Sequence, residues 1–282
     1  DGLITYDNRH GWRGPEQQHP PLEKERPEAL DKRWRSALRA MPVIADLRPA
    51  IVTELLEDGV RVLLRDGSDG FLSWREDLRR IRRYLDEDRR TGSAQTLSDL
   101  LSVGDLIRVS ENDDSLRLAQ VPRVQGALVS LDPSDGSIKA LVGGMGFVLS
   151  KFNRATQAKR QPGSNFKAFL YAAALENGIH PAKLINDAPV VVGNLTDEDL
   201  WRPENDSGRF YGPTRVREAL TFSRNLVSIR VLQQLGVRKL IEMAARVGFD
   251  VNDMQPNLTL ALGTHAYTPL EVASGYTAIA NG

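Results

Sequence analysis

The sequence predicts an α+β protein, in which a small β-barrel is followed by an incomplete domain of helices on an antiparallel sheet. Two observations lead to this prediction. Between residues 43 and 123, short apolar runs are separated by turn-forming residues, as expected of hairpins. After residue 124, one more hairpin pattern is followed mainly by segments in which apolar residues recur at helical spacing.

The first domain contains a series of short predicted strands. Asp58-Gly59 separates the first two, and Asn112-Asp113-Asp114 separates the last two, so each pair is expected to form a hairpin. Short strands of this kind, with an insertion between the third and the fourth, are typical of an OB-like β-barrel. The strands are expected at 50–56, 60–64, 70–74, 105–110 and 116–121.

The insertion, residues 76–99, is rich in arginine. A groove for nucleic acid is one interpretation of such a run. Acidic residues (Asp77, Asp86, Glu87 and Asp88) are interleaved with the arginines, so we favour a solvated face with ion pairs. The arginines are Arg79, Arg80, Arg82, Arg83, Arg89 and Arg90.

Residues 1–42 are expected to form a linker with one short helix at 31–38. The segment 6–16 is dense in arginine, aromatic and glycine residues, which suits either a docking surface or a packed loop. The sequence therefore divides into a linker at 1–42, the barrel at 43–123 and the second domain at 124–282.

The second domain opens with a predicted hairpin at 127–131 and 137–142. Thr214 is expected to cap one later helix, and Thr268-Pro269-Leu270-Glu271 forms a capping box that opens another. Two strands cannot cover so many apolar helix faces. We therefore expect further strands beyond residue 282, and an open sheet edge or poor folding without them.

One turn and helix, residues 161–175, brings reactive side chains together. Pro162-Gly163 forms a turn, Ser164 lies where the helix should begin, and Lys167 follows on the same face. A serine hydroxyl is a weak nucleophile until a base takes its proton, and lysine is such a base where burial lowers its pKa. A serine N-cap with a solvated lysine is the alternative.

Composition excludes several classes of function. The 282 residues include 37 basic and 37 acidic side chains, so the chain lacks the net positive charge that nucleic-acid binding usually needs. The absence of cysteine excludes disulfides, thiol catalysis and cysteine-based zinc sites. The histidines lack metal-ligand spacing, so we expect no metal and no cofactor. No apolar run reaches the about 18 residues of a membrane helix, and no signal peptide is visible.

Four residues resemble the active site of the penicillin-binding protein and β-lactamase superfamily. Ser164 and Lys167 match its Ser-x-x-Lys motif, and Ser223 and Asn225 match Ser-x-Asn. Longer stretches are similar, in order, to class A (bifunctional) penicillin-binding proteins of the 1a type. Segment 6–16 resembles that family's interdomain linker, and the barrel resembles its inserted OB-like domain. The longer stretches are 127–133, 140–144, 154–167, 201–205, 260–264 and 268–273.

The resemblance implies the N-terminal part of a peptidoglycan D,D-transpeptidase domain, whose substrates are D-Ala–D-Ala stem peptides and an acceptor amine. Ser164 would attack the D-Ala–D-Ala carbonyl and Lys167 would take its proton. Ser223 would relay a proton to the leaving D-Ala, and Asn225 would hold the substrate amide and the lysine. The backbone N–H of Ser164 would form half of an oxyanion hole. β-Lactams would acylate the same serine.

The same resemblance implies a place on the periplasmic face of the bacterial inner membrane. A membrane anchor and a glycosyltransferase domain are then expected upstream of Asp1, which is not a Met, so the chain would be a fragment. A regulatory protein is a further expected partner, bound by the OB-like domain, whereas nucleic acid is not.

Two departures from the family pattern matter. Ala168 stands where the family usually has proline, and no Lys-Thr-Gly follows Ser223. Arg90-Thr91-Gly92 resembles that third motif chemically, but it lies in the first domain. The missing motif agrees with the missing strands, so we expect an incomplete site.

Two other functions remain open. A hydrolase of the same superfamily, a β-lactamase or carboxypeptidase, would need a carboxylate to activate the deacylating water, and Glu204 is a candidate. A non-catalytic module, in which the barrel recruits partners and Ser164 only caps a helix, is the other alternative.

Overall fold

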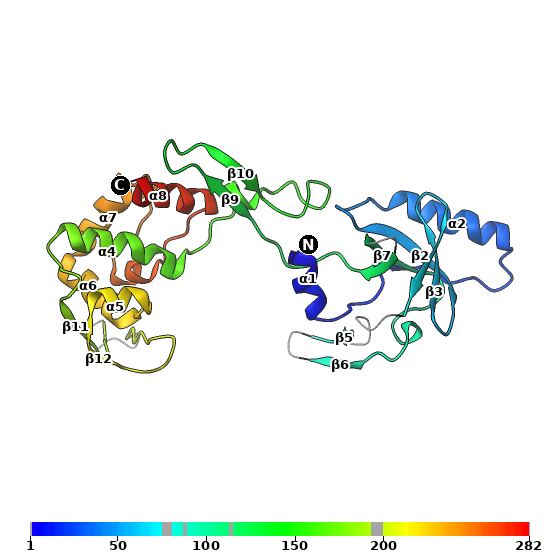
Figure 1. Ribbon diagram of the computed structural model, residues 1–282, viewed down its shortest axis with the longest axis horizontal. Helices are drawn as coiled ribbons and strands as arrows, with labels where there is room; N and C mark the ends of the chain where they lie inside the picture. The colour runs from blue at the N-terminus through cyan, green and yellow to red at the C-terminus, as the bar shows by residue number, and fades with distance from the viewer. Residues whose placement is uncertain (1, 75–80, 87–88, 113–114, 193–199, 282) are drawn as a thin grey trace. The chain divides into compact units, whose positions relative to one another are not determined.

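The computed structural model describes residues 2–74, 81–86, 89–112, 115–192 and 200–281. The chain forms two compact units, whose elements are labelled in Figure 1. The barrel unit comprises Asp1–Gly126 with Gly144–Phe152, and the helical unit comprises Ala127–Gly143 with Asn153–Gly282.

The barrel unit is built on a six-stranded antiparallel sheet with the order β1-β7-β2-β3-β4, in which β8 also pairs with β7. β4 lies against β8, so the sheet curls toward a barrel. All of the strands expected from the sequence are present, which confirms an OB-like architecture. The sheet consists of β1 (Gln17–Gln18), which was not expected, and of β2 (Arg48–Leu55), β3 (Gly59–Leu64), β4 (Asp69–Ser73), β7 (Asp105–Asn112) and β8 (Ser115–Ala119).

Both faces of this sheet are buried, because successive residues of a strand point to opposite sides. On β2, Ala50 and Val52 belong to the core inside the barrel, with Val62 of β3. Ile51, between them, faces a second core that includes Trp34 and Leu38 of helix α2 (Pro27–Ala40). The helix therefore covers the outer face of the sheet.

The segment 1–42, expected as a linker, carries three elements of the barrel unit. Helix α1 (Gly2–Arg9) comes first, β1 pairs with β7, and α2 packs on the sheet. The Trp34 indole N–H also donates to the His19 carbonyl at 2.8 Å, which ties α2 to the strand that precedes it. The division of the chain at residues 42 and 123 remains a proposal.

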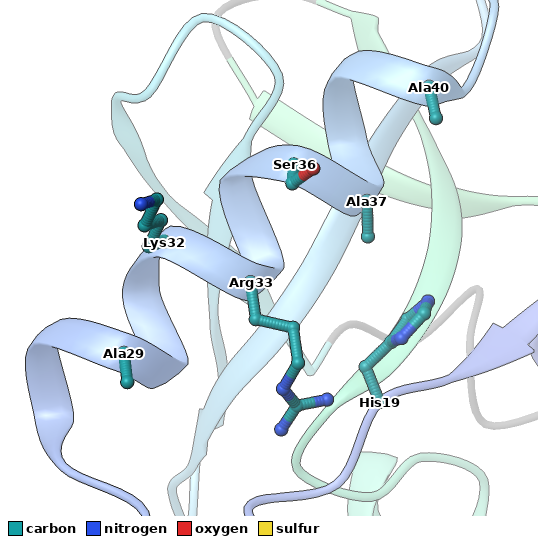
Figure 2. Close-up of a pocket in the computed structure, with 7 residues that line it drawn as sticks. All are labelled: His19, Ala29, Lys32, Arg33, Ser36, Ala37 and Ala40. Atoms are coloured by element: carbon teal, nitrogen blue, oxygen red, sulfur yellow. The ribbon is translucent and has the colours of Figure 1, made fainter.

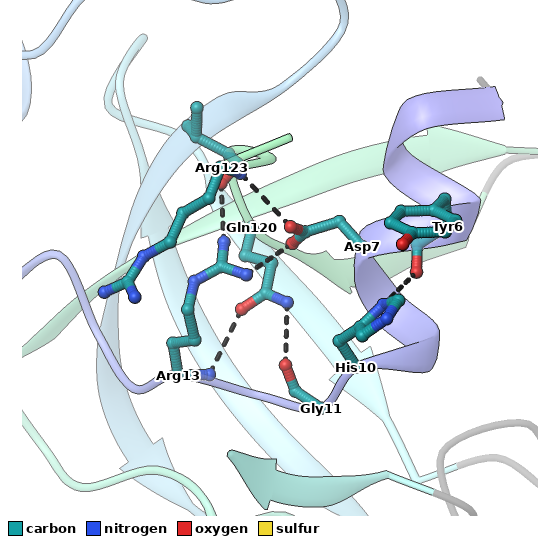
Figure 3. A network of polar contacts seen from close by, with 8 residues as sticks. Tyr6, Asp7, His10, Gly11, Arg13, Gln120 and Arg123 are labelled. Carbon is teal, nitrogen blue, oxygen red and sulfur yellow. Dashed lines mark hydrogen bonds and ion pairs between the residues drawn. The ribbon is translucent and has the colours of Figure 1, made fainter. Parts of the chain in front are cut away.

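A set of polar contacts joins the beginning of the barrel unit to the residues that follow its last strand, β8 (Figure 3). Asp7, which is 5% exposed, accepts from the Arg13 guanidinium at 2.6 Å and from the backbone N–H of Arg123 at 3.1 Å. The side-chain amide of Gln120 donates to the Gly11 carbonyl at 2.9 Å. These bonds hold the two ends of the module together.

The arginine-rich insertion forms a small antiparallel pair, β5 (Arg82–Tyr84) and β6 (Arg90–Ser93), followed by the 3₁₀ turn η2 (Leu97–Asp99). Arg89 pairs with Asp86 at 2.7 Å, and both side chains are exposed, as expected of a solvated face with ion pairs. Arg79, Arg80 and the acidic residues Asp77, Glu87 and Asp88 lie outside the described residues.

The helical unit centres on helix α4 (Lys167–Glu176), which packs against α6 and α7 (Figure 1). Phe166, Phe169, Leu170 and Ala174 belong to its main core, which the helical spacing of apolar residues predicts. The other elements are β9 (Leu128–Leu131), β10 (Ile138–Val142), α3 (Arg154–Gln157), η3 (Gly163–Phe166), β11 (Leu184–Asp187), β12 (Gly212–Arg215), α5 (Val216–Thr221), α6 (Asn225–Leu235), α7 (Val237–Arg246), η4 (Leu258–Leu262) and α8 (Pro269–Asn281).

Two expectations about helix starts are wrong. Thr214 does not cap a helix, because it lies in β12, and α5 starts at Val216. The helix expected to begin at Ser164 begins at Lys167, since Ser164 lies inside the 3₁₀ turn η3 that precedes it. The capping box before α8 is confirmed, with reciprocal bonds between Thr268 and Glu271.

The hairpin β9–β10 forms a two-stranded sheet among the described residues. Helix α8 lies beside β9, but Leu128, Ile138 and Val142 are each more than half exposed. The hairpin therefore has an uncovered apolar surface, and strands beyond residue 282 remain a prediction.

Arg108 of β7 is the basis of a stability prediction. Its side chain is 1% exposed, and it donates to both carboxylate oxygens of Glu16, at 2.8 and 3.0 Å, and to the Pro42 carbonyl. We expect Glu16→Ala to lower the free energy of unfolding of the barrel unit by about 2 kcal/mol, because the Arg108 charge would stay buried without its carboxylate. Chemical denaturation measures this change.

Arg48→Ala is the matched control. Arg48 pairs with Glu111 at 3.1 Å, but both side chains are 49% exposed, so its loss should change the free energy of unfolding by less than about 0.5 kcal/mol. Equal effects of the two substitutions would contradict the structural role given to Arg108.

Candidate active site

The predicted nucleophile lies on a tight turn. Ser164 is the second residue of η3, and Lys167 is the first residue of α4, three positions later. Gly163 has a φ of 58°, a left-handed conformation that glycine adopts without strain. Ser164 is exposed, whereas Lys167 is 1% exposed, so the turn places a hydroxyl at the surface beside a buried amine.

Gly263, which directly follows η4, packs against the backbone of this turn. Its carbonyl accepts from the Gly163 N–H at 3.2 Å. Its φ is 69°, and a Cβ at this position would overlap the Gly163 carbonyl oxygen. Two backbone segments thus approach each other at a distance that no larger residue permits.

Ser223 lies in the break between two helices, and Asn225 is the first residue of the second helix. α5 ends at Thr221 and α6 begins at Asn225. Ser223 has a φ of 53°, one of three non-glycine residues in the described chain with a positive φ. Such a conformation costs on the order of 1 kcal/mol and is typical of functional sites.

The structure brings all four predicted residues together. The Lys167 Nζ donates to the Ser223 carbonyl at 2.8 Å, to the Ser223 Oγ at 3.0 Å and to the Asn225 Oδ1 at 2.7 Å. The Ser223 Oγ in turn donates to the Ser164 Oγ at 3.0 Å. Among the described residues, the bonds that connect Lys167 to Ser164 run through Ser223.

Burial sets the protonation of this lysine. Loss of water around the amine lowers the pKa of Lys167 to about 8 from its ordinary value of 10.5. At neutral pH, about one molecule in ten then carries the neutral amine. The lysine can therefore act as a base near physiological pH, which a solvated lysine cannot.

Segment 201–205, which carries part of the family resemblance, lies beside the four-residue cluster. In the structure, the Glu204 carbonyl accepts from the Asn225 side-chain amide at 2.9 Å, and Asn205 accepts from the Asn225 backbone N–H at 2.9 Å. Glu204 thus contributes its backbone oxygen to the cluster. Asp187, which binds Asn205, had no sequence signal at all.

Other features lie elsewhere in the fold. A shallow pocket on the outer face of α2 contains none of the four residues (Figure 2). Arg90-Thr91-Gly92 lies in β6 of the barrel unit. No described helix is both long and apolar enough to cross a bilayer. The pocket is lined by His19, Ala29, Lys32, Arg33, Ser36, Ala37 and Ala40.

Comparison with known families matches the two parts of the chain separately. Residues 12–124 match the family described as penicillin-binding protein OB-like domain. Residues 126–282 match the penicillin binding protein transpeptidase domain, and this match covers more than half of the chain.

Individual relatives match the whole chain. It is 44% identical over 283 aligned residues to penicillin-binding protein 1A of Pseudomonas aeruginosa, and 39% identical over 283 to that of Escherichia coli K12. The chain spans about a third of the length of these curated relatives, 34% and 33%. A crystal structure of penicillin-binding protein 1A from Haemophilus influenzae matches 99% of this chain and 39% of its own, with 34% identity and a TM-score of 0.84.

The contact between Gly263 and Gly163 leads to a second stability prediction. We expect Gly263→Ala to lower the free energy of unfolding of the helical unit by about 3 kcal/mol, because the methyl group adds an overlap with backbone to the strain of a positive φ. Chemical denaturation again measures the change.

Gly178→Ala is the matched control. Gly178 has a φ of 82°, but nothing lies near its hypothetical Cβ, so strain alone should cost about 1 kcal/mol. A Gly263→Ala effect no larger than that of the control would contradict the close approach.

Proposed function

We propose that this chain, which belongs to the penicillin-binding protein family, carries the serine site of a peptidoglycan D,D-transpeptidase that cross-links stem peptides through an acyl-enzyme. The observation that carries the proposal is the pair of hydrogen bonds that connects buried Lys167, through Ser223, to exposed Ser164. A hydroxyl connected in this way to a base of lowered pKa is an activated nucleophile.

The hydrogen bonds of Lys167 indicate how the proton moves. A protonated lysine has three N–H donors, and the site offers three acceptors. Once the amine is neutral, one of these partners has to donate to it. Only the Ser223 hydroxyl has a proton to give, because the other two acceptors are amide carbonyls. Ser223 then takes the proton of Ser164 as that oxygen attacks.

In the proposed reaction, the Ser164 Oγ forms a bond with the carbonyl carbon of the D-Ala–D-Ala peptide bond. The C–N bond breaks, and the leaving D-Ala amine receives a proton from Ser223, which Lys167 replenishes. An amine of a neighbouring stem peptide then attacks the ester carbon, the C–O bond to Ser164 breaks, and the proton that the amine loses passes through Ser223 to the Ser164 Oγ. The N–H of Ser164, in the first turn of η3, suits the developing oxyanion.

The setting of this site follows from the family. We propose that the full protein lies on the periplasmic face of the bacterial inner membrane, with a membrane anchor and a glycosyltransferase domain before the barrel unit. The barrel unit would bind a regulatory protein. A cofactor has no step in this reaction.

Covalent capture tests the proposal. We expect the full-length protein to gain the mass of one penicillin per chain, and Ser164→Ala to gain none, because Ser164 is the exposed hydroxyl that the relay joins to Lys167. Intact-mass spectrometry measures both. An equal adduct in the variant, or none in the parent, would sink the proposal, and an adduct lost within seconds would favour a hydrolase of the same superfamily.

The rate of acylation should depend on pH. The neutral amine is the base, and its fraction rises as pH passes the Lys167 pKa of about 8. From pH 6 to pH 8 the acylation rate should increase by about fiftyfold, and it should level off above pH 9. Stopped-flow measurement with a chromogenic β-lactam gives this profile. A rate that stays flat over this range would show that Lys167 is not the titrating base.

A further inference from the structure

Asn225 is held from outside the four-residue cluster, by the segment that contains Asn205. The Asn225 side-chain N–H₂ donates to the Glu204 carbonyl oxygen at 2.9 Å. A carbonyl oxygen can only accept a hydrogen bond. The amide therefore has one permitted orientation, with Oδ1 directed at Lys167. If the amide turned over, two hydrogen-bond donors would face each other at the Lys167 amine, and two acceptors at Glu204.

Asn205 also caps the helix that presents Asn225. Arg224, at the N-cap position of α6, makes no side-chain capping bond. The Oδ1 of Asn205 takes that place, because it accepts from the backbone N–H of Asn225 at 2.9 Å and of Leu226 at 3.4 Å. A residue from a distant loop thus satisfies the first N–H groups of this helix.

Asn205 is in turn fixed by a buried carboxylate. Its Nδ2 donates to both oxygens of Asp187, at 2.8 and 3.0 Å, and to the Arg209 carbonyl at 2.8 Å. Asp187 is the last residue of β11 and is 0% exposed. A carboxylate on one side and backbone N–H groups on the other leave the Asn205 amide a single orientation.

We propose that Asp187 and Asn205 are positioning residues for the active site, which hold the first turn of α6 in place so that the Asn225 side-chain amide lies between the Glu204 carbonyl and Lys167; this role rests on the proposed function. The chain of contacts runs from a buried strand end to the catalytic lysine through two amides of fixed orientation. Hydrogen bonds in such a chain polarise one another, so the Asp187 charge also strengthens Asn205 as an acceptor.

The test uses the saturation kinetics of penicillin acylation in the full-length protein, which separate the initial binding constant from the acylation rate constant. We expect Asn205→Ala to lower the rate constant about tenfold, as for one misplaced hydrogen bond to a charged group, with the binding constant unchanged. The number of acylated sites per chain should also stay the same. A purely structural role would reduce the number of active sites and leave the rate constant of the remainder intact.

Ser228→Ala is the matched control. Ser228 is buried in the same helix and bonds to the Tyr171 hydroxyl at 3.1 Å and to the Arg224 carbonyl, but it makes no bond to the four-residue cluster. Its substitution should destabilise the unit to a similar extent while the acylation rate constant changes less than about twofold.

A second variant keeps the test decisive if Asn205→Ala does not fold. Asp187→Asn preserves the size of the side chain and one acceptor for Asn205, but removes the charge. We expect its acylation rate constant to fall severalfold with unchanged binding. Unchanged rate constants in the folded variants would overturn the positioning role. A parent protein that forms no adduct would instead overturn the proposed function.

Discussion

An ammonium group that leaves water needs an acceptor for each of its three protons, and the helical unit is arranged around that requirement at Lys167. The acceptors come from one short break between α5 and α6, and two of them belong to Ser223. Ser223 supplies both from a left-handed backbone conformation, and these hydrogen bonds to a charge offset the strain of that conformation. The same burial lowers the pKa of Lys167, so the amine gives up its proton more readily and can act as a base near neutral pH.

The lysine, its acceptors and the nucleophile come from two distant segments of the chain, and each segment is held by contacts of its own. The core of α4 anchors the lysine, since Phe166, Phe169 and Leu170 are buried beside it. The backbone contact with Gly263 fixes the serine turn. A stable hydrophobic core thus serves to place a polar cluster that would not assemble alone, because isolated polar contacts gain little over water.

Much of this could be predicted from sequence where the signal is local. Asp58-Gly59 and the alternation around it specify a hairpin, and the spacing of Ser164 and Lys167 specifies a shared face. Two kinds of feature could not be predicted from the sequence. A two-residue strand such as β1 has too few residues for a periodicity, and its neighbour decides its conformation. Asp187 and Asn205 meet only because β11 and the following loop return to α6, and no local pattern encodes such a contact. The helix start expected at Ser164 is misplaced for a related reason, since a 3₁₀ turn and the first turn of a helix favour the same residues.

The bonds between Asp7, Arg13 and Arg123 bring together the two ends of the barrel module. A module whose ends are tied in this way has a fixed, narrow base. Its strands and loops can diverge, lengthen or be exchanged between proteins without changing the separation of the segments that flank it. Evolution could therefore vary the surface of the barrel freely, while the geometry of its attachment to the chain stays constant.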